Sequence, residues 1–255
     1  MGSWSEDESG RSSTFRVLRA IWYVLESYRD DLRGNEVCHW TDHRNAEIIL
    51  SVGSRIPDLH REAVLVYKLC RELNIRLSVE WVSRNDNSIA DELSRVEDAT
   101  DYMPDPKCFR YIDQLWGPHT VDRFASIKTK QLVRYCSRYR NPGCEASNAF
   151  TVSWSLDNNW NFPPPLLIPK VLSHMSAGHE YGTLIAPEWP SAVWWPLLVD
   201  RSGTWKRFIK DCLRIEPYQG IFLSGSAASS IFTSVMPSFA VLALKICFDD
   251  LVKST

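Results

Sequence analysis

Two aspartates follow segments that are predicted to be strands, at positions where a carboxylate could bind a metal ion. Residues 36–41 are predicted to form a strand, and Asp42 comes directly after it. The second aspartate, Asp91, falls in the first turn of a short helix predicted to begin at Ser88, after a strand around Trp81. The helix dipole alone also favours an acid in a first turn. A functional and a purely structural interpretation of Asp91 therefore both remain open.

The elements that must position these aspartates are two strands with helices between them. Residues 75–82 alternate apolar and polar side chains around Trp81, which predicts a half-buried strand ending in a polar turn. Apolar residues at helical spacing predict helices over residues 43–50 and 61–73. The predicted order is therefore strand, two helices and strand.

A family resemblance appears in the residues around both aspartates, which are Trp81-Val82-Ser83-Arg84, Asn87, Ala90-Asp91, Leu93-Ser94-Arg95 and the pair Thr41-Asp42. The later block resembles the last strand and final helix of the ribonuclease H domains attached to retroelement reverse transcriptases. The Thr-Asp pair resembles the end of the strand that holds the third carboxylate of this family.

The resemblance implies a catalytic site and a substrate. Asp42 and Asp91 would be the third and fourth metal-binding carboxylates and therefore catalytic residues, with Mg²⁺ as the cofactor. Thr41, Arg84 and Asn87 would contact the substrate, the RNA strand of an RNA–DNA hybrid. Two-metal hydrolysis of a phosphodiester needs clustered carboxylates of this kind.

One departure from the family lies in the predicted first helix, residues 12–32, where Ser12 or Ser13 would be the N-cap. Val17 occupies the place of the glutamate that bridges the two metal ions in the family, and valine offers no ligand. In the family, the first metal-binding aspartate lies on the first strand. Residues 2–8 resemble the end of the third strand, so no residue of this sequence matches that aspartate. We therefore expect impaired hydrolysis. The alternative is a non-catalytic retroelement remnant or a nucleic-acid-binding protein.

Blocks in the second half of the chain resemble a second region, and they are Thr120-Val121-Asp122-Arg123-Phe124-Ala125-Ser126, Asn148-Ala149-Phe150, Trp154, Phe162-Pro163-Pro164-Pro165 and the segment 182–190. They occur in this order in DIRS-type tyrosine-recombinase retrotransposons. In those elements this region follows ribonuclease H and is similar to a Dam-like adenine-N6 methyltransferase.

Methyl transfer is not expected from this second region. An adenine-N6 methyltransferase uses a polar acceptor, two prolines and an aromatic ring on one loop. Here Phe162 stands in the acceptor place and Pro165 in the aromatic place. No glycine-rich turn for S-adenosylmethionine follows Asp122, so this cofactor is not expected either.

These patterns predict an α/β protein in which a truncated ribonuclease H-like fold precedes a small Rossmann-like, methyltransferase-like unit. The predicted division is a partial ribonuclease H-like domain at 1–95, a linker at the acidic, proline-containing segment 96–106, and the second domain at 107–255. Whether Met1 is the true start, or the chain is part of a longer polyprotein, is left open.

Composition limits the remaining function classes. The net charge of −2 and the pI near 6.3 show no global basic field, so contacts with nucleic acid would depend on local Lys and Arg. Seven cysteines without a C-x-x-C pair, and the lack of a secretory signal pattern, predict an intracellular location in the cytoplasm or nucleus.

Glycine and proline interrupt the charge-free segment 217–244, so no membrane span is expected. A Ser224–His119–Asp122 triad is not predicted, because no G-x-S-x-G pattern is present. Protein partners stay open.

Overall fold

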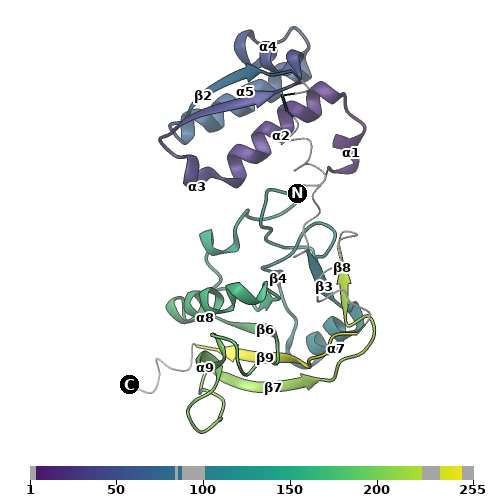
Figure 1. The fold of residues 1–255 in the computed structure, drawn as a ribbon, viewed down its shortest axis with the longest axis vertical. Coiled ribbons are helices and arrows are strands. Elements are labelled where there is room, and N and C mark those ends of the chain that lie inside the picture. The colour runs from purple at the N-terminus through teal and green to yellow at the C-terminus, as the bar shows by residue number, and fades with distance from the viewer. Residues whose placement is uncertain (1–3, 84–85, 88–100, 226–235, 249–255) are drawn as a thin grey trace. The chain divides into compact units, whose positions relative to one another are not determined.

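A computed structural model of the chain describes residues 4–83, 86–87, 101–225 and 236–248. The chain divides into two compact units, of which unit 1 comprises Met1–Val96 with Tyr139–Pro142 and unit 2 comprises Glu97–Arg138 with Gly143–Thr255. Both units combine helices with β-sheet, which confirms the expected α/β character (Figure 1). Within the described ranges, no helix is both long and apolar enough to cross a membrane.

Unit 1 is a two-stranded sheet with helices packed on it. Its elements in chain order are α1 (Glu6–Ser9), α2 (Ser13–Ser27), α3 (Arg29–Leu32), β1 (Glu36–Thr41), α4 (Arg44–Val52), α5 (Pro57–Glu72) and β2 (Arg76–Trp81). The strands β1 and β2 are parallel, and their register places Thr41 opposite Trp81. Because α4 and α5 connect two parallel strands, the carboxyl ends of both strands lie at the same edge.

The helices of unit 1 form because their apolar residues recur on one face. In α2 the buried residues are Phe15, Leu18, Ile21 and Leu25, which pack with the buried side of α5. Ser12 is the N-cap, since its Oγ accepts a hydrogen bond from the backbone N–H of Phe15 at 3.2 Å. The predicted helix 12–32 is interrupted at Tyr28, where the backbone leaves helical geometry and α3 begins.

The start of the chain differs from the expected strand end at residues 2–8. Its described part contains the short helix α1, which begins after Ser5. Ser5 Oγ accepts the backbone N–H of Glu8, and the Glu8 carboxylate accepts the backbone N–H of Ser5 at 2.9 Å. This reciprocal capping box stabilises the first turn of a helix, so the expected strand end is wrong over Glu6–Glu8.

Unit 2 contains a five-stranded mixed sheet and a two-stranded sheet. Its elements are β3 (Tyr102–Pro104), α7 (Pro106–Trp116), β4 (Val121–Asp122), η1 (Ala149–Thr151), β5 (Asn159–Asn161), η2 (Pro165–Leu167), α8 (Ile168–Ala177), β6 (Tyr181–Pro187), α9 (Trp195–Leu198), β7 (Ile209–Ile215), β8 (Phe222–Ser224) and β9 (Val241–Cys247). The large sheet has the order β4-β5-β6-β9-β7. Strands β4, β5 and β6 are parallel, whereas β9 runs antiparallel to both of its neighbours.

The predicted linker 96–106 is not a linker throughout. Within it, Tyr102–Pro104 form β3, which pairs antiparallel with β8. Asp101 accepts hydrogen bonds from the hydroxyls of Ser126 and Thr129. A strand of three residues with a proline gives almost no periodicity, and its partner lies more than a hundred residues later, which explains why the local pattern missed it.

Candidate functional site

The carboxyl edge of β1 and β2 is the candidate site in unit 1. Thr41 is buried at the end of β1, and its Oγ1 accepts the backbone N–H of His43 at 3.1 Å. The next residue, Asp42, is exposed. Trp81, at the end of β2, donates its indole N–H to the backbone oxygen of Asp42 at 3.2 Å. The two strand ends are therefore hydrogen-bonded to each other, and the Asp42 side chain faces solvent.

The turn that follows β2 forms the other half of this edge. Ser83 donates its hydroxyl to Asp86 Oδ2 at 2.6 Å, and the backbone N–H of Asn87 bonds to the Ser83 carbonyl oxygen at 3.1 Å. Asn87 is half-buried in this turn. The predicted site residues Arg84 and Asp91 lie outside the described residues. Of the five predicted site residues, the structure thus brings Thr41, Asp42 and the Asn87 turn to one edge.

The residues described at this edge do not by themselves supply a two-metal centre. In the described ranges, no group of three or more His, Cys, Asp or Glu side chains is placed so that it could hold a metal ion. Val17, on α2, is half-buried and packs against the core of unit 1. A Mg²⁺ ion relies on charged oxygen ligands, and the described part of this edge offers Asp42 and, in the turn after β2, Asp86.

Two neighbours of Asp42 add features that the predicted site lacked. The guanidinium of Arg44 lies over the ring of Trp81, 5.1 Å from its centroid, so a cation and a partly exposed ring stand together at the edge. The Nδ1 atom of His43 is buried and has no hydrogen-bond partner among the described residues. The sequence shows that Arg44 is a cation close to Asp42. Its contact with Trp81 could not be predicted, because it depends on the pairing of β1 with β2.

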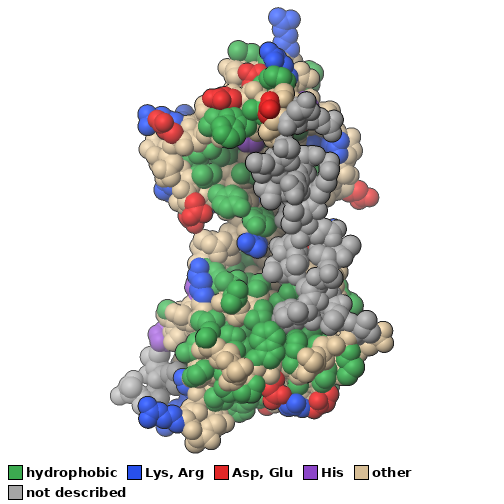
Figure 2. All heavy atoms as spheres, in the orientation of Figure 1, with side chains coloured by type: hydrophobic (Ala, Val, Ile, Leu, Met, Phe, Trp, Pro, Cys, Tyr) green, Lys and Arg blue, Asp and Glu red, His purple; other side chains and the backbone are tan. Residues whose placement is uncertain are grey.

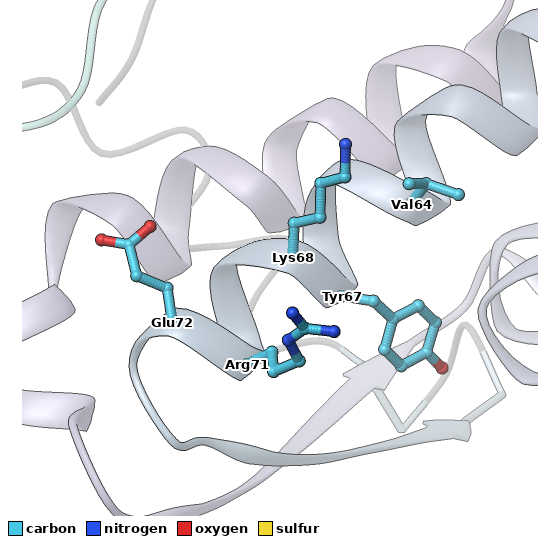
Figure 3. Close-up of a pocket in the computed structure, with 5 residues that line it drawn as sticks. All are labelled: Val64, Tyr67, Lys68, Arg71 and Glu72. Carbon is cyan, nitrogen blue, oxygen red and sulfur yellow. The ribbon is translucent and has the colours of Figure 1, made fainter.

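A hollow of about 520 Å³ lies on the exposed side of α5, lined by Val64, Tyr67, Lys68, Arg71 and Glu72. Figure 3 shows Arg71 reaching toward Tyr67, while Lys68 points away from both. Leu73, directly after α5, accepts the backbone N–H of Gly34, which lies just before β1. The end of α5 is therefore at the amino edge of the sheet, opposite the edge that holds Asp42.

In unit 2, the residues at the carboxyl ends of β4 and β5 are buried. Asp122 accepts the backbone N–H groups of Phe124 at 3.3 Å and Gln131 at 3.0 Å, and its burial raises the pKa of the carboxyl to about 7. Asn161 is fully buried, and its Oδ1 has no hydrogen-bond partner among the described residues. Phe162, in the acceptor place of the expected methyltransferase loop, stacks on Phe222 with ring centroids 5.5 Å apart. This loop therefore presents packed rings rather than a polar acceptor.

Arg123 is likewise used inside the fold. Its guanidinium donates to Asp157 at 2.9 Å and to Asn159 Oδ1 at 2.8 Å, and its side chain is almost fully buried. The ion pair with Arg123 and a second one with Arg134 help to hold the pKa of Asp157 below its usual range against the opposing effect of burial. These charges stabilise the connection between β4 and β5.

A buried histidine in unit 2 has an arrangement that sequence reasoning missed. His119 Nδ1 lies 2.6 Å from Asp113 Oδ1, and its Nε2 lies 2.8 Å from the Thr183 hydroxyl. The order acid, histidine and hydroxyl is that of a nucleophilic triad. Thr183 also borders a hollow of about 250 Å³. However, the side chains of Thr183 and His119 have no exposed surface, so a substrate cannot reach the hydroxyl. The arrangement ties α7 to β6.

Comparison with known proteins adds no relative: no protein-family model matches the chain, and a search of the curated proteins found no match.

Proposed function

We propose that unit 1 is a retrotransposon-derived, ribonuclease H-like unit that binds RNA–DNA hybrids at the carboxyl edge of β1 and β2, with its two-metal hydrolysis impaired. The observation that supports this proposal most directly is the exposed Asp42 at the end of a strand whose parallel neighbour ends beside it. Ligands of open parallel sheets bind at this edge. The order of helix, strand, two helices and strand agrees with the resemblance around Asp42 and Trp81.

The impairment follows from the ligands that the chain offers. Val17 contributes only methyl groups, where the family has a bridging glutamate. Each missing carboxylate weakens a Mg²⁺ site that depends on charged oxygens. Binding of the hybrid does not need these carboxylates, because cations and exposed rings provide most of the contact with a nucleic acid. Arg44 and Trp81 are such groups.

We also infer that unit 2 is a small Rossmann-like, methyltransferase-like unit without methyl-transfer activity. Its three parallel strands, with α8 between β5 and β6, support the Rossmann-like assignment. The packed ring of Phe162 argues against a base-binding acceptor loop.

Hybrid binding and cleavage by the whole chain test the proposal for unit 1. We expect a labelled RNA–DNA hybrid to bind, and Arg44→Ala to weaken binding several-fold and reduce the salt slope by about 1, as for the loss of one phosphate contact. Arg76→Ala is the matched control, because Arg76 lies at the start of β2 and pairs with Glu36 at 2.7 Å. We expect this control to bind as the unchanged protein does.

Two outcomes would contradict the proposal. If the hybrid does not bind, or if Arg44→Ala and Arg76→Ala weaken binding equally, the carboxyl edge is not the binding site and the inert remnant becomes the better description. With Mg²⁺ present, we expect the unchanged protein to cleave the RNA strand of the hybrid no faster than the Asp42→Asn variant does. Mg²⁺-dependent cleavage that this substitution abolishes would show that hydrolysis is intact.

A further inference from the structure

The loop between α9 and β7 exposes cations that have no acidic partner among the described residues. In unit 2, Arg123, Arg134 and Arg214 all form ion pairs with acidic side chains. Arg201, Lys206 and Arg207 differ, because no carboxylate of the described residues lies within ion-pair distance of them, and each is at least partly exposed. Figure 2 shows Lys and Arg side chains at the surface near this loop, at the lower left of the view.

The one acid within this loop is used to hold the turn. Asp200 accepts hydrogen bonds from the backbone N–H of Ser202 at 2.8 Å, the Ser202 hydroxyl at 2.6 Å and the backbone N–H of Thr204 at 3.0 Å. These bonds lower the pKa of Asp200, so its carboxylate stays ionised. Gly203, with φ +81, allows the tight reversal. The carboxylate is therefore directed into the turn.

The base of the loop is fixed by backbone pairing and by tryptophans. Val199 and Trp205 form an antiparallel bridge, and the backbone N–H of Lys206 donates to the Leu198 carbonyl at 2.9 Å. The ring of Trp205 meets that of Trp195 edge to face, with centroids 5.9 Å apart, and both rings remain partly exposed. The loop is thus a hairpin-like turn that presents cations next to partly exposed aromatic rings.

The charge of this loop opposes that of the whole protein. Residues 199–207 contain three cations and one acid, whereas the full chain has a net charge of −2. A local positive surface on a slightly acidic protein attracts polyanions to that surface and not to the molecule in general. Cations next to partly exposed tryptophans are the combination that binds single-stranded nucleic acid, because the cations contact phosphates and the rings contact bases.

We propose that the loop 199–207 is a binding surface for the sugar–phosphate backbone of single-stranded nucleic acid, with Arg201, Lys206 and Arg207 as the phosphate contacts and Trp205 as the base contact. This surface belongs to unit 2 and does not depend on the hybrid-binding edge proposed for unit 1. It would give the chain an affinity for single strands.

Binding of a labelled oligothymidylate to the whole chain, measured by fluorescence anisotropy at several salt concentrations, tests this proposal. The test variant combines Arg201→Gln, Lys206→Gln and Arg207→Gln. The control combines Lys107→Gln, Arg110→Gln and Lys128→Gln, which removes the same charge from three other exposed positions of unit 2. We expect the test variant to bind about tenfold more weakly at low salt and its salt slope to fall by about 2, at roughly 0.7 per phosphate contact. The control should change neither value appreciably.

Several outcomes would overturn the proposal. It fails if the unchanged protein does not bind the oligonucleotide, or if the test and control variants lose affinity equally. It also fails if the loop substitutions reduce binding to anionic phospholipid vesicles but not to the oligonucleotide, which would indicate a membrane surface as the ligand. Arg44→Ala, which tests unit 1, should leave the loop-dependent difference intact, so that failure of one proposal is distinguishable from failure of the other.

Discussion

The carboxyl edges of the two sets of parallel strands differ in their access to solvent. In unit 1, β1 is followed by an exposed aspartate beside Trp81, and Trp81 is 43% exposed. In unit 2, β4 and β5 end at Asp122 and Asn161, and Phe162 follows; these three are at most 6% exposed. A polar residue at the end of a strand or directly after it is the local pattern in both units. The comparison shows that such a pattern leaves the polar side chain accessible to a ligand only where the edge stays open.

The largest expected effect concerns the buried carboxyl edge of β4 and β5 in unit 2. Replacing Phe162 with alanine removes a ring that packs on Phe222 and Tyr102, and we expect a loss of about 3–5 kcal/mol in the unfolding free energy of unit 2. Leu166→Ala is the matched control, since Leu166 is 91% exposed and its replacement should change stability by less than about 0.5 kcal/mol. Denaturant unfolding of both variants measures the difference. Equal, small losses would mean that the edge is not a packed core.

The next effect is a pH dependence caused by Asp122. Burial raises its pKa in the folded state to about 7, whereas the unfolded chain releases this proton near pH 4. Between these values the folded state holds a proton that the unfolded state has lost, so the unfolding free energy falls as pH rises, by up to about 1.4 kcal/mol per pH unit. The contribution is fully present below pH 4 and is lost above pH 7.

Asp122→Asn isolates this effect, because the amide stays neutral at every pH. The difference between the unfolding free energies of the two proteins should change across this window and become constant above pH 7. Other groups, such as Asp157 with its lowered pKa, contribute equally to both proteins and cancel in the difference. A difference that does not vary with pH would show that Asp122 is ionised in the folded protein.

The smallest effect is expected at the exposed carboxyl edge of β1 and β2 in unit 1. Asp42 is exposed, so Asp42→Asn should change the unfolding free energy of unit 1 by less than about 0.5 kcal/mol. Thermal unfolding of the two proteins at the same pH measures this change. A loss above 1 kcal/mol would mean that Asp42 stabilises the fold and would weaken its assignment to a binding edge.

Local patterns in the sequence predicted the elements of unit 1 better than those of unit 2. The helices α2 and α5 were predicted from their periodicity, because one apolar face determines each of them, and the strand β1 was predicted as well. The strand β3 was missed, since its stability depends on β8, a partner far along the chain. Strand β4 is confined to Val121–Asp122, because the backbone of Phe124 turns back to bond the Asp122 side chain.

The candidate site shows the same limit. The position of Asp42 at a strand end follows from the local pattern, and the structure places it there. The contact between Arg44 and Trp81, and the contacts of His119 with Asp113 and Thr183, depend on residues that only the folded chain brings together. No spacing rule links Arg44 to Trp81 or His119 to Thr183 across such separations. Arg84 and Asp91, which fall outside the described residues, stay predictions.

The order of strands in unit 2 has a consequence for how the protein is made. Strand β9 is synthesised after β6 and β7, yet it lies between them and hydrogen-bonds to both. While the ribosome has not yet released residues 241–247, β6 and β7 lack the strand that separates and joins them, and both present unpaired backbone edges. Assembly of this sheet is therefore postponed until residues 241–247 have been synthesised, and until then the unpaired edges are open to pairing with other chains.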